Sequence, residues 1–138
     1  MLAKDIMSKK PEFLPPNATL KQAADQMRTH DYGFIPVGEN DRLIGAITDR
    51  DIVIRAVCEG KDPNKATLRD IMSKGIHYCL ETDYIEKVAQ QMEKLQIRRL
   101  VVLNSDKRLV GIISLGDIAT KSKNAKLCSE LTDAVSQD

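Results

Sequence analysis

The sequence has few aromatic residues, no Trp and almost no net charge. Aromatic residues make up 4% of its 138 positions. A formal net charge of +1, from 21 basic and 20 acidic residues, excludes the long-range positive field of a general nucleic-acid binder. Few aromatic rings remain to stack on bases. We therefore expect no nucleic-acid partner.

Long apolar segments are also missing. The longest unbroken apolar runs, such as residues 100–103, are far shorter than the roughly 18 to 20 residues that a membrane-spanning helix needs. Residues 1–5 lack the apolar core of a signal peptide. We expect a chain that does not enter a membrane and stays in the cytoplasm.

Cysteine is scarce, and its three residues form no C-x-x-C pair. Cys58, Cys79 and Cys128 lie far apart in the sequence, which favours reduced, half-buried thiols over a disulfide framework. A catalytic cysteine needs a histidine partner, and only His30 and His77 are present. A chain of 15.4 kDa is long enough to bury an ordinary hydrophobic core without disulfides or metals.

An internal repeat organises the chain. Asp-Ile-Met-Ser-Lys at residues 5–9 returns at residues 70–74, an offset of 65. Further on, Gly45 aligns with Gly111 at an offset of 66. The offset therefore changes by one residue in the polar segment between Val37 and Gly45, which is predicted to be a hairpin turn. Insertions are tolerated best in such surface turns. The repeat predicts two copies of one structural unit.

The apolar spacing predicts the same order of elements in both copies. Residues 20–27 and 85–92 have the i, i+3, i+4, i+7 spacing of an amphipathic helix. Each is followed by two apolar runs around a polar turn, which predicts a β-hairpin, and then by a helix that opens near Thr48 or Ser114.

The predicted fold is α/β (α+β), with two strand-helix-strand-strand-helix repeats related by a pseudo-twofold axis and packed sheet to sheet. We expect the first repeat at residues 1–62 and the second at residues 63–122, joined by a polar turn. Residues 123–138 are expected to form a polar tail or a short helix.

Both hairpins end in a glycine, two apolar residues, a hydroxyl residue, two variable residues and Asp. The hydroxyl and acid are Thr48 and Asp51 in one repeat, Ser114 and Asp117 in the other. This spacing is typical of a capping box, in which each side chain binds a free backbone N–H of the helix. The same corner can also bind a ligand, with the hydroxyl on a phosphate oxygen and Asp on ribose hydroxyls. Both interpretations stay open, and the duplication favours the ligand.

These motifs resemble a tandem pair of cystathionine-β-synthase (CBS) domains, often called a Bateman module. The likeness extends from Lys4 to Ala119 and includes the Asp-Ile-Met-Ser opening, residues 32–37 and 97–102, and both hydroxyl-x-x-Asp corners. It implies a regulatory module that requires no cofactor. Its ligands would be adenosine-containing molecules, AMP, ADP, ATP or S-adenosylmethionine, bound in two clefts between the repeats.

The resemblance also implies which residues form each cleft. One cleft would use Thr48, Arg50 and Asp51 with Tyr78, Ile97 and Arg98. The second would use Ser114, Gly116 and Asp117 with Phe13, Tyr32, Gly33 and Phe34. Arg99 resembles a phosphate-contacting basic residue of the family, and the alternative is a solvated surface arginine. Phe13 and Tyr78 replace small hydroxyl residues, so their rings either fill the adenine pocket or stack on the base.

Other classes of function are less well supported. The sequence has no G-x-x-x-x-G-K-[ST] loop, so we expect no phosphoryl-transfer enzyme of that type and no enzyme activity. Asp49 and Asp51 are compatible with a metal ion, but capping and solvation is the favoured interpretation. The second hypothesis is a protein-interaction or scaffold module whose clefts are filled by its own side chains.

The expected partners are an adenine nucleotide, an unidentified effector protein and a second copy of the chain. We expect no effector domain beside the two repeats, so a signal would pass to a separate protein or through the oligomeric state. The resemblance implies a homodimer in which the helices flanking each repeat pack against the second copy. Four apolar residues on these helices, Met27, Ile52, Met92 and Ile118, serve either that interface or the core.

Overall fold

The computed structural model describes residues 1–9 and 11–121, which form two compact units. The central unit is Glu12–Ile76, and the terminal unit combines Met1–Pro11 with the chain from His77 onward. The expected tail or helix at residues 123–138, with Cys128, lies outside the described residues. None of the helices in the described ranges is long and apolar enough to cross a membrane.

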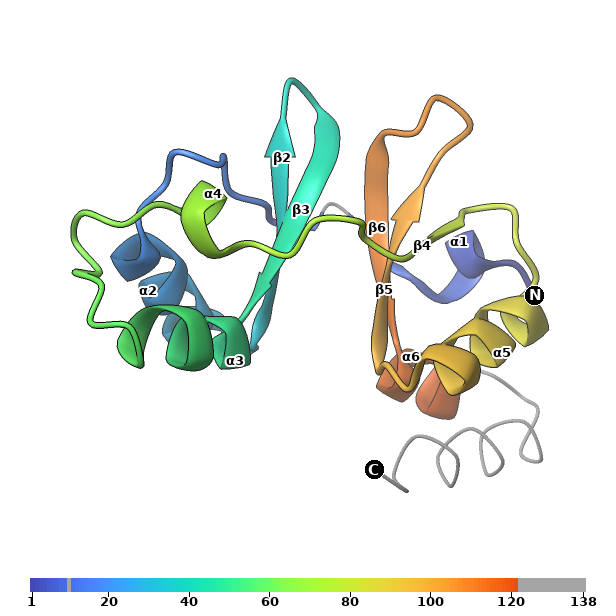
Figure 1. Ribbon diagram of the computed structural model, residues 1–138. Coiled ribbons are helices and arrows are strands. Elements are labelled where there is room, and N and C mark those ends of the chain that lie inside the picture. The colour runs from blue at the N-terminus through green and yellow to red at the C-terminus, as the bar shows by residue number, and fades with distance from the viewer. Residues whose placement is uncertain (10, 122–138) are drawn as a thin grey trace. The chain divides into compact units, whose positions relative to one another are not determined.

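The central unit is a β-hairpin with helices on one side (Figure 1). Its elements are α2 (Leu20–His30), β2 (Phe34–Glu39), β3 (Arg42–Thr48), α3 (Asp49–Ile52), the π-helix η1 (Val53–Val57) and α4 (Leu68–Ile71). The strands pair antiparallel, and Asn40 and Asp41 form their two-residue turn with positive φ. Asn and Asp tolerate this left-handed conformation well. The predicted helix and hairpin are confirmed.

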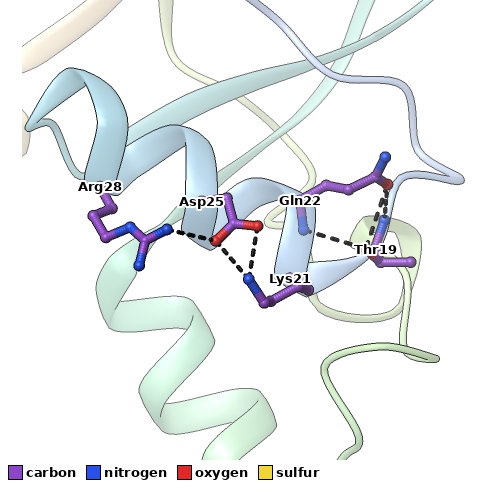
Figure 2. Close-up of polar contacts among 5 residues, drawn as sticks. All are labelled: Thr19, Lys21, Gln22, Asp25 and Arg28. Atoms are coloured by element: carbon purple, nitrogen blue, oxygen red, sulfur yellow. Dashed lines mark hydrogen bonds and ion pairs between the residues drawn. The ribbon is translucent and has the colours of Figure 1, made fainter.

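Helix α2 begins at a capping box. The Thr19 N–H donates to Gln22 Oε1 at 2.8 Å, and the Gln22 N–H donates to Thr19 Oγ1 at 3.2 Å (Figure 2). One turn later, Asp25 accepts a hydrogen bond from Lys21 Nζ at 2.6 Å and lies 3.5 Å from Arg28 Nη2. The Lys21 hydrogen bond holds the pKa of the Asp25 carboxyl below its usual value. These contacts pair the polar side chains on the exposed side of α2, and its apolar side chains pack in the core.

The terminal unit contains a sheet built from both parts of its chain. Its elements are α1 (Ala3–Ile6), β1 (Ser8–Lys9), β4 (Tyr78–Leu80), α5 (Ile85–Leu95), β5 (Arg99–Leu103), β6 (Leu109–Ser114) and α6 (Leu115–Lys121). The strand order is β1-β6-β5-β4, with β4 parallel to β5 and the other neighbours antiparallel. The N-terminal segment therefore completes the sheet of the second repeat.

The opening strand of the first repeat is shorter than expected. In the second repeat, β4 pairs with β5 over three residues, whereas the first repeat has only an isolated bridge between Leu14 and Val37. Pro15 and Pro16 follow Leu14 directly. Because proline has no N–H to donate, the ladder cannot continue past this bridge.

Each unit has its own hydrophobic core. Buried side chains of α2, β2, β3, η1 and α4 form one cluster, and those of α1, α5, α6 and the terminal sheet form the other. Met27 is buried in the central core and Ile52 packs against it, while Met92 and Ile118 are buried in the terminal core. These four side chains therefore serve the cores of the units.

The repeated Asp-Ile-Met-Ser-Lys segments pack on a strand glycine. Met72 lies against Gly45 in the central unit, and Met7 lies against Gly111 in the terminal unit. A β-carbon at Gly45 would come within 2.6 Å of the Met72 sulfur and 3.1 Å of the Ser73 carbonyl oxygen. Both strands need glycine at this position, because the packed Asp-Ile-Met-Ser-Lys segment occupies the space that a side chain on the strand would fill.

We expect Gly45→Ala to destabilise the protein by about 1–3 kcal/mol, because the methyl group would displace the buried Met72 and the neighbouring main chain. Urea unfolding followed by circular dichroism measures this change. Gly116→Ala is the control, since a β-carbon there would lie 3.6 Å from the side-chain oxygen of Ser114, an ordinary van der Waals distance, and alanine favours a helix. Equal stability of Gly45→Ala and wild type would contradict this packing.

Candidate functional site

Both strand-to-helix corners form the predicted capping box. The Thr48 N–H donates to Asp51 Oδ2 at 3.0 Å, and the Asp51 N–H donates to Thr48 Oγ1 at 3.1 Å. The same pair of bonds joins Ser114 and Asp117 at 2.9 and 3.0 Å. These bonds satisfy free N–H groups at the helix start and hold each carboxylate at the end of a strand.

Capping engages only one oxygen of each carboxylate. Asp51 Oδ1 lies 3.9 Å from Arg55 Nε, and Asp117 Oδ1 lies 3.5 Å from Lys121 Nζ. The side chains of Asp51 and Asp117 are 16% and 17% exposed. An ionised carboxylate has about four acceptor positions, so each Oδ1 keeps capacity for further donors such as sugar hydroxyls.

The two basic partners, Arg55 and Lys121, were not among the predicted site residues. Each lies four residues after its aspartate, a spacing that brings side chains together on a helix. The sequence therefore contained a signal for both ion pairs, and that signal occurs at matching positions of the two repeats.

In the central unit, the loop before β2 lies beside the Thr48 corner. Phe34 pairs with Thr48 across the hairpin, so both side chains stand on one face of it. The Asp49 N–H donates to the Gly33 carbonyl at 3.0 Å. The Asp49 carboxylate covers the Cα of Gly33, where a β-carbon would lie 2.6 Å from Asp49 Oδ2. The structure thus brings Gly33 and Phe34 to the corner of their own unit.

The terminal unit repeats this arrangement with basic residues. Arg99 pairs with Ser114, as Phe34 pairs with Thr48 in the central unit. The Leu115 N–H donates to the Arg98 carbonyl at 2.8 Å. Arg98 and Arg99 therefore lie at the Ser114 corner, and Ile97, just before them, packs against the core of the terminal unit.

The two corners differ in charge. Arg98 and Arg99 are exposed, and their side chains make no ion pair within the described part of the chain. At the central corner, the exposed charges without an ion-pair partner among the described residues are Asp49 and Arg50. The terminal corner thus presents two uncompensated positive charges, while the two charges of the central corner cancel.

Phe13 and Tyr32 occupy different parts of the central unit. Phe13 packs on Gly38, where a β-carbon would lie 3.1 Å from its ring, at the turn end of the hairpin. It does not lie at the Thr48 corner of its own unit. Tyr32 packs against the central core, and its hydroxyl accepts a hydrogen bond from Gln26 Nε2 at 3.1 Å.

Tyr78 begins β4 in the terminal unit and is 39% exposed. It pairs with Val101, which lies two residues after Arg99 on β5. Because alternate residues share a face, Tyr78 and Arg99 stand on the same face of the sheet, one row apart.

The two groupings implied by the resemblance each combine residues of both units. Thr48, Arg50 and Asp51 belong to the central unit, whereas Tyr78, Ile97 and Arg98 belong to the terminal unit. The second grouping likewise draws Ser114, Gly116 and Asp117 from the terminal unit, and its four other residues from the central unit. Both groupings remain predictions.

Cys79 and Cys58 differ in exposure, since Cys79 is buried and Cys58 is exposed. Burial raises the pKa of the Cys79 thiol to about 12, and the charge of Asp83 acts in the same direction. Cys58 is exposed at the end of η1. Within residues 1–9 and 11–121, no group of three or more His, Cys, Asp or Glu side chains is arranged to hold a metal ion.

Comparison with known proteins places this geometry in a family. A family model described as the CBS domain matches the chain twice, at residues 3–57 and 68–124. The chain is 42% identical over 118 residues to Hypoxic response protein 1 of Mycobacterium tuberculosis, which covers 85% of this chain and 82% of that protein.

Two solved structures resemble the fold closely. One is Hypoxic Response Protein I with two coordinated zinc ions, at 41% identity and a TM-score of 0.79, covering 86% of this chain and 97% of that one. The other is the CBS domain pair of protein MJ0100 in complex with 5′-methylthioadenosine and S-adenosyl-L-methionine. It is 31% identical, with a TM-score of 0.75, and the match covers 86% of this chain and 93% of that one.

We expect iodoacetamide at pH 8 to modify Cys58 in the folded protein and to leave Cys79 unmodified. Burial excludes the reagent from Cys79, and its raised pKa keeps the thiol protonated, whereas the thiolate is the reactive form. Mass spectrometry of the digested protein measures both sites, and labelling in urea is the control. Equal native labelling of both cysteines would show that Cys79 is not buried as described.

Proposed function

Because the chain belongs to the CBS domain family, we propose that it is a regulatory module that binds adenosine-containing ligands at its two corners. The observation that supports this most is the second oxygen of each capping aspartate, which remains able to accept hydrogen bonds. The relative MJ0100, 31% identical, was solved with two ligands that both contain an adenosine group.

Each residue of the corner has a defined role in this proposal. The Oδ1 of Asp51 or Asp117 accepts hydrogen bonds from the two ribose hydroxyls. The hydroxyl of Thr48 or Ser114 already accepts a backbone N–H, and its own proton is donated to a phosphate or another ligand acceptor. The ligand leaves unchanged, because the module acts as a sensor and not as an enzyme.

We propose that the charge difference favours different ligands at the two corners, each taken with the residues of its own unit and not in the mixed groupings that the resemblance implies. Arg98 and Arg99 at the terminal corner favour ligands that carry phosphate, such as AMP, ADP or ATP, since guanidinium groups bind phosphate in a bidentate manner. At the central corner, the charges of Asp49 and Arg50 cancel, so no net positive charge favours phosphate, and the apolar side chain of Phe34 lies beside Thr48 across the hairpin. This corner suits ligands without phosphate, such as 5′-methylthioadenosine or S-adenosylmethionine.

We expect calorimetric titration of the wild type to detect ATP at one site and 5′-methylthioadenosine at another. Asp117→Ala should weaken ATP binding by at least about tenfold, because hydrogen bonds to a charged group contribute about 1.5–3 kcal/mol each. Asp51→Ala should weaken 5′-methylthioadenosine binding by a similar factor and leave ATP binding unchanged.

The matched control for both variants is Asp70→Ala. Asp70 forms the same capping box with Thr67 at the start of α4 but lies outside the two corners, so this variant loses a cap without losing a site. If Asp70→Ala lost as much ligand binding as the corner variants, the loss in those variants would be explained by lower helix stability and not by a lost ligand contact. No heat with any adenosine ligand would favour the scaffold alternative.

The homodimer is part of the proposal, and its proposed interface is a surface of the central unit. Val53, Ile54 and Val57 on η1 are 54%, 46% and 66% exposed, although all three are apolar. Adjacent exposed apolar side chains are typical of an interaction surface. We infer that this η1 face packs against a second copy, and that occupancy of the corners reaches an effector protein through this assembly.

We expect sedimentation velocity to show a dimer for the wild type and a monomer for Val57→Lys, because a lysine at this place puts a charge into the apolar contact. Tyr84→Lys is the control, since Tyr84 is as exposed as Val57 but lies in the terminal unit. A wild-type monomer, or a dimer that survives Val57→Lys, would exclude the η1 face as the interface.

A further inference from the structure

In both units, a basic side chain lies beside the corner carboxylate and also contacts the main chain of another segment. Arg55 approaches Asp51 Oδ1 to 3.9 Å, and Lys121 approaches Asp117 Oδ1 to 3.5 Å. In both cases the contact is to the oxygen that the capping box does not use. The basic residue occupies the same position of each repeat but is Arg in one and Lys in the other.

Each of these cations also binds a main-chain carbonyl of a repeated segment. Arg55 Nη1 donates to the Ile71 carbonyl at 3.3 Å and lies 3.5 Å from Ser73 Oγ. Lys121 Nζ donates to the Ile6 carbonyl at 3.1 Å. Ile6 and Ile71 are the matching isoleucines of the two Asp-Ile-Met-Ser-Lys segments. Two different side chains therefore make the same connection.

The segments contacted in this way lead into the connectors between the units, since Ile6 precedes Pro11 and Ile71 precedes Ile76 by five residues each. The chain passes from the terminal unit to the central unit after Pro11, and returns after Ile76. Just before the return, Ser73 is anchored to β3, where its N–H donates to the Ala46 carbonyl at 2.9 Å and the Ala46 N–H donates back at 3.1 Å. Each cation thus binds the segment that leads into a connector.

We propose that Arg55 and Lys121 are positioning residues that couple occupancy of each corner carboxylate to the anchoring of the adjacent connector. This coupling presupposes the adenosine binding proposed above. Ribose hydroxyls that donate to Oδ1 compete with the cation for the same oxygen, because both seek its negative charge. The cation side chain, half-exposed in the case of Arg55, then loses the contact that orients it towards the connector carbonyl.

The direction of the effect follows from linkage. If ligand binding weakens the hold of Arg55 on Ile71, then that hold weakens ligand binding to the same extent. Removing the charge of Arg55 should therefore loosen the connector without ligand and improve binding of an uncharged ligand. An uncharged probe is needed, because a phosphate would respond to the lost positive charge directly.

The test is amide hydrogen exchange of Ser73 in the full chain, measured by NMR with and without saturating 5′-methylthioadenosine. In the wild type we expect the ligand to speed exchange by about threefold or more, the effect of weakening one hydrogen bond. Arg55→Gln should show the faster exchange without ligand, no further change with it, and tighter binding of the probe. Arg55→Lys, which places here the residue type of Lys121, should restore the wild-type response.

Arg69→Gln is the matched control. Arg69 also pairs with a carboxylate, Glu39, at 3.3 Å, but neither residue belongs to a corner. This variant should keep the wild-type response of Ser73 to ligand. A ligand response in Arg55→Gln equal to that of the wild type would overturn the coupling while leaving the proposed function intact.

A double-mutant cycle without ligand separates this coupling from the proposed function, with amide exchange of Ser73 as the measurement. Asp51→Asn removes the charge that orients Arg55, so its effect on Ser73 exchange should be small when Arg55 is already Gln. Additive effects of Asp51→Asn and Arg55→Gln would overturn the bridge regardless of any ligand. If instead no adenosine ligand binds the wild type but the cycle is non-additive, the proposed function fails and the bridge stands.

Discussion

The reciprocal hydrogen bonds between a hydroxyl residue and the aspartate three residues later are the contact on which both functional corners depend. They end a strand, start a helix and hold Asp51 and Asp117 with one oxygen engaged. Capping alone does not distinguish these aspartates, since Asp70 caps α4 in the same way. The distinction comes from their neighbours, a cross-strand partner on the sheet and a cation one helical turn later.

The architecture follows from the sequence to a large extent because its main features are local. The spacing of apolar residues predicts α2, α5 and both hairpins, and the Thr-x-x-Asp and Ser-x-x-Asp patterns predict where α3 and α6 begin. The reduced opening strand at Leu14 also has a local cause, the two prolines that follow it. The spacing indicates the fold class for the same reason, since the pattern occurs twice in the chain, once in each repeat.

What the sequence could not predict depends on contacts between distant segments. The packing of Met72 on Gly45, and of the N-terminal Met7 on Gly111, joins residues that no local pattern relates. Along the chain, residues 68–76 follow the first repeat's last helix, yet they pack into the central unit. The position of Asp49 over Gly33 and the bonds from Arg55 and Lys121 to isoleucine carbonyls are likewise visible only in three dimensions.

The central claim is that the corner carboxylates bind the two hydroxyls of a ribose. Calorimetric titration of the full chain with adenosine and with 2′,3′-dideoxyadenosine tests it most directly, because the two molecules share the base and differ only in those hydroxyls. If the claim is right, adenosine binds and the dideoxy compound binds at least about tenfold more weakly, as expected for lost hydrogen bonds to a charged group. Equal affinity for the two compounds would contradict it.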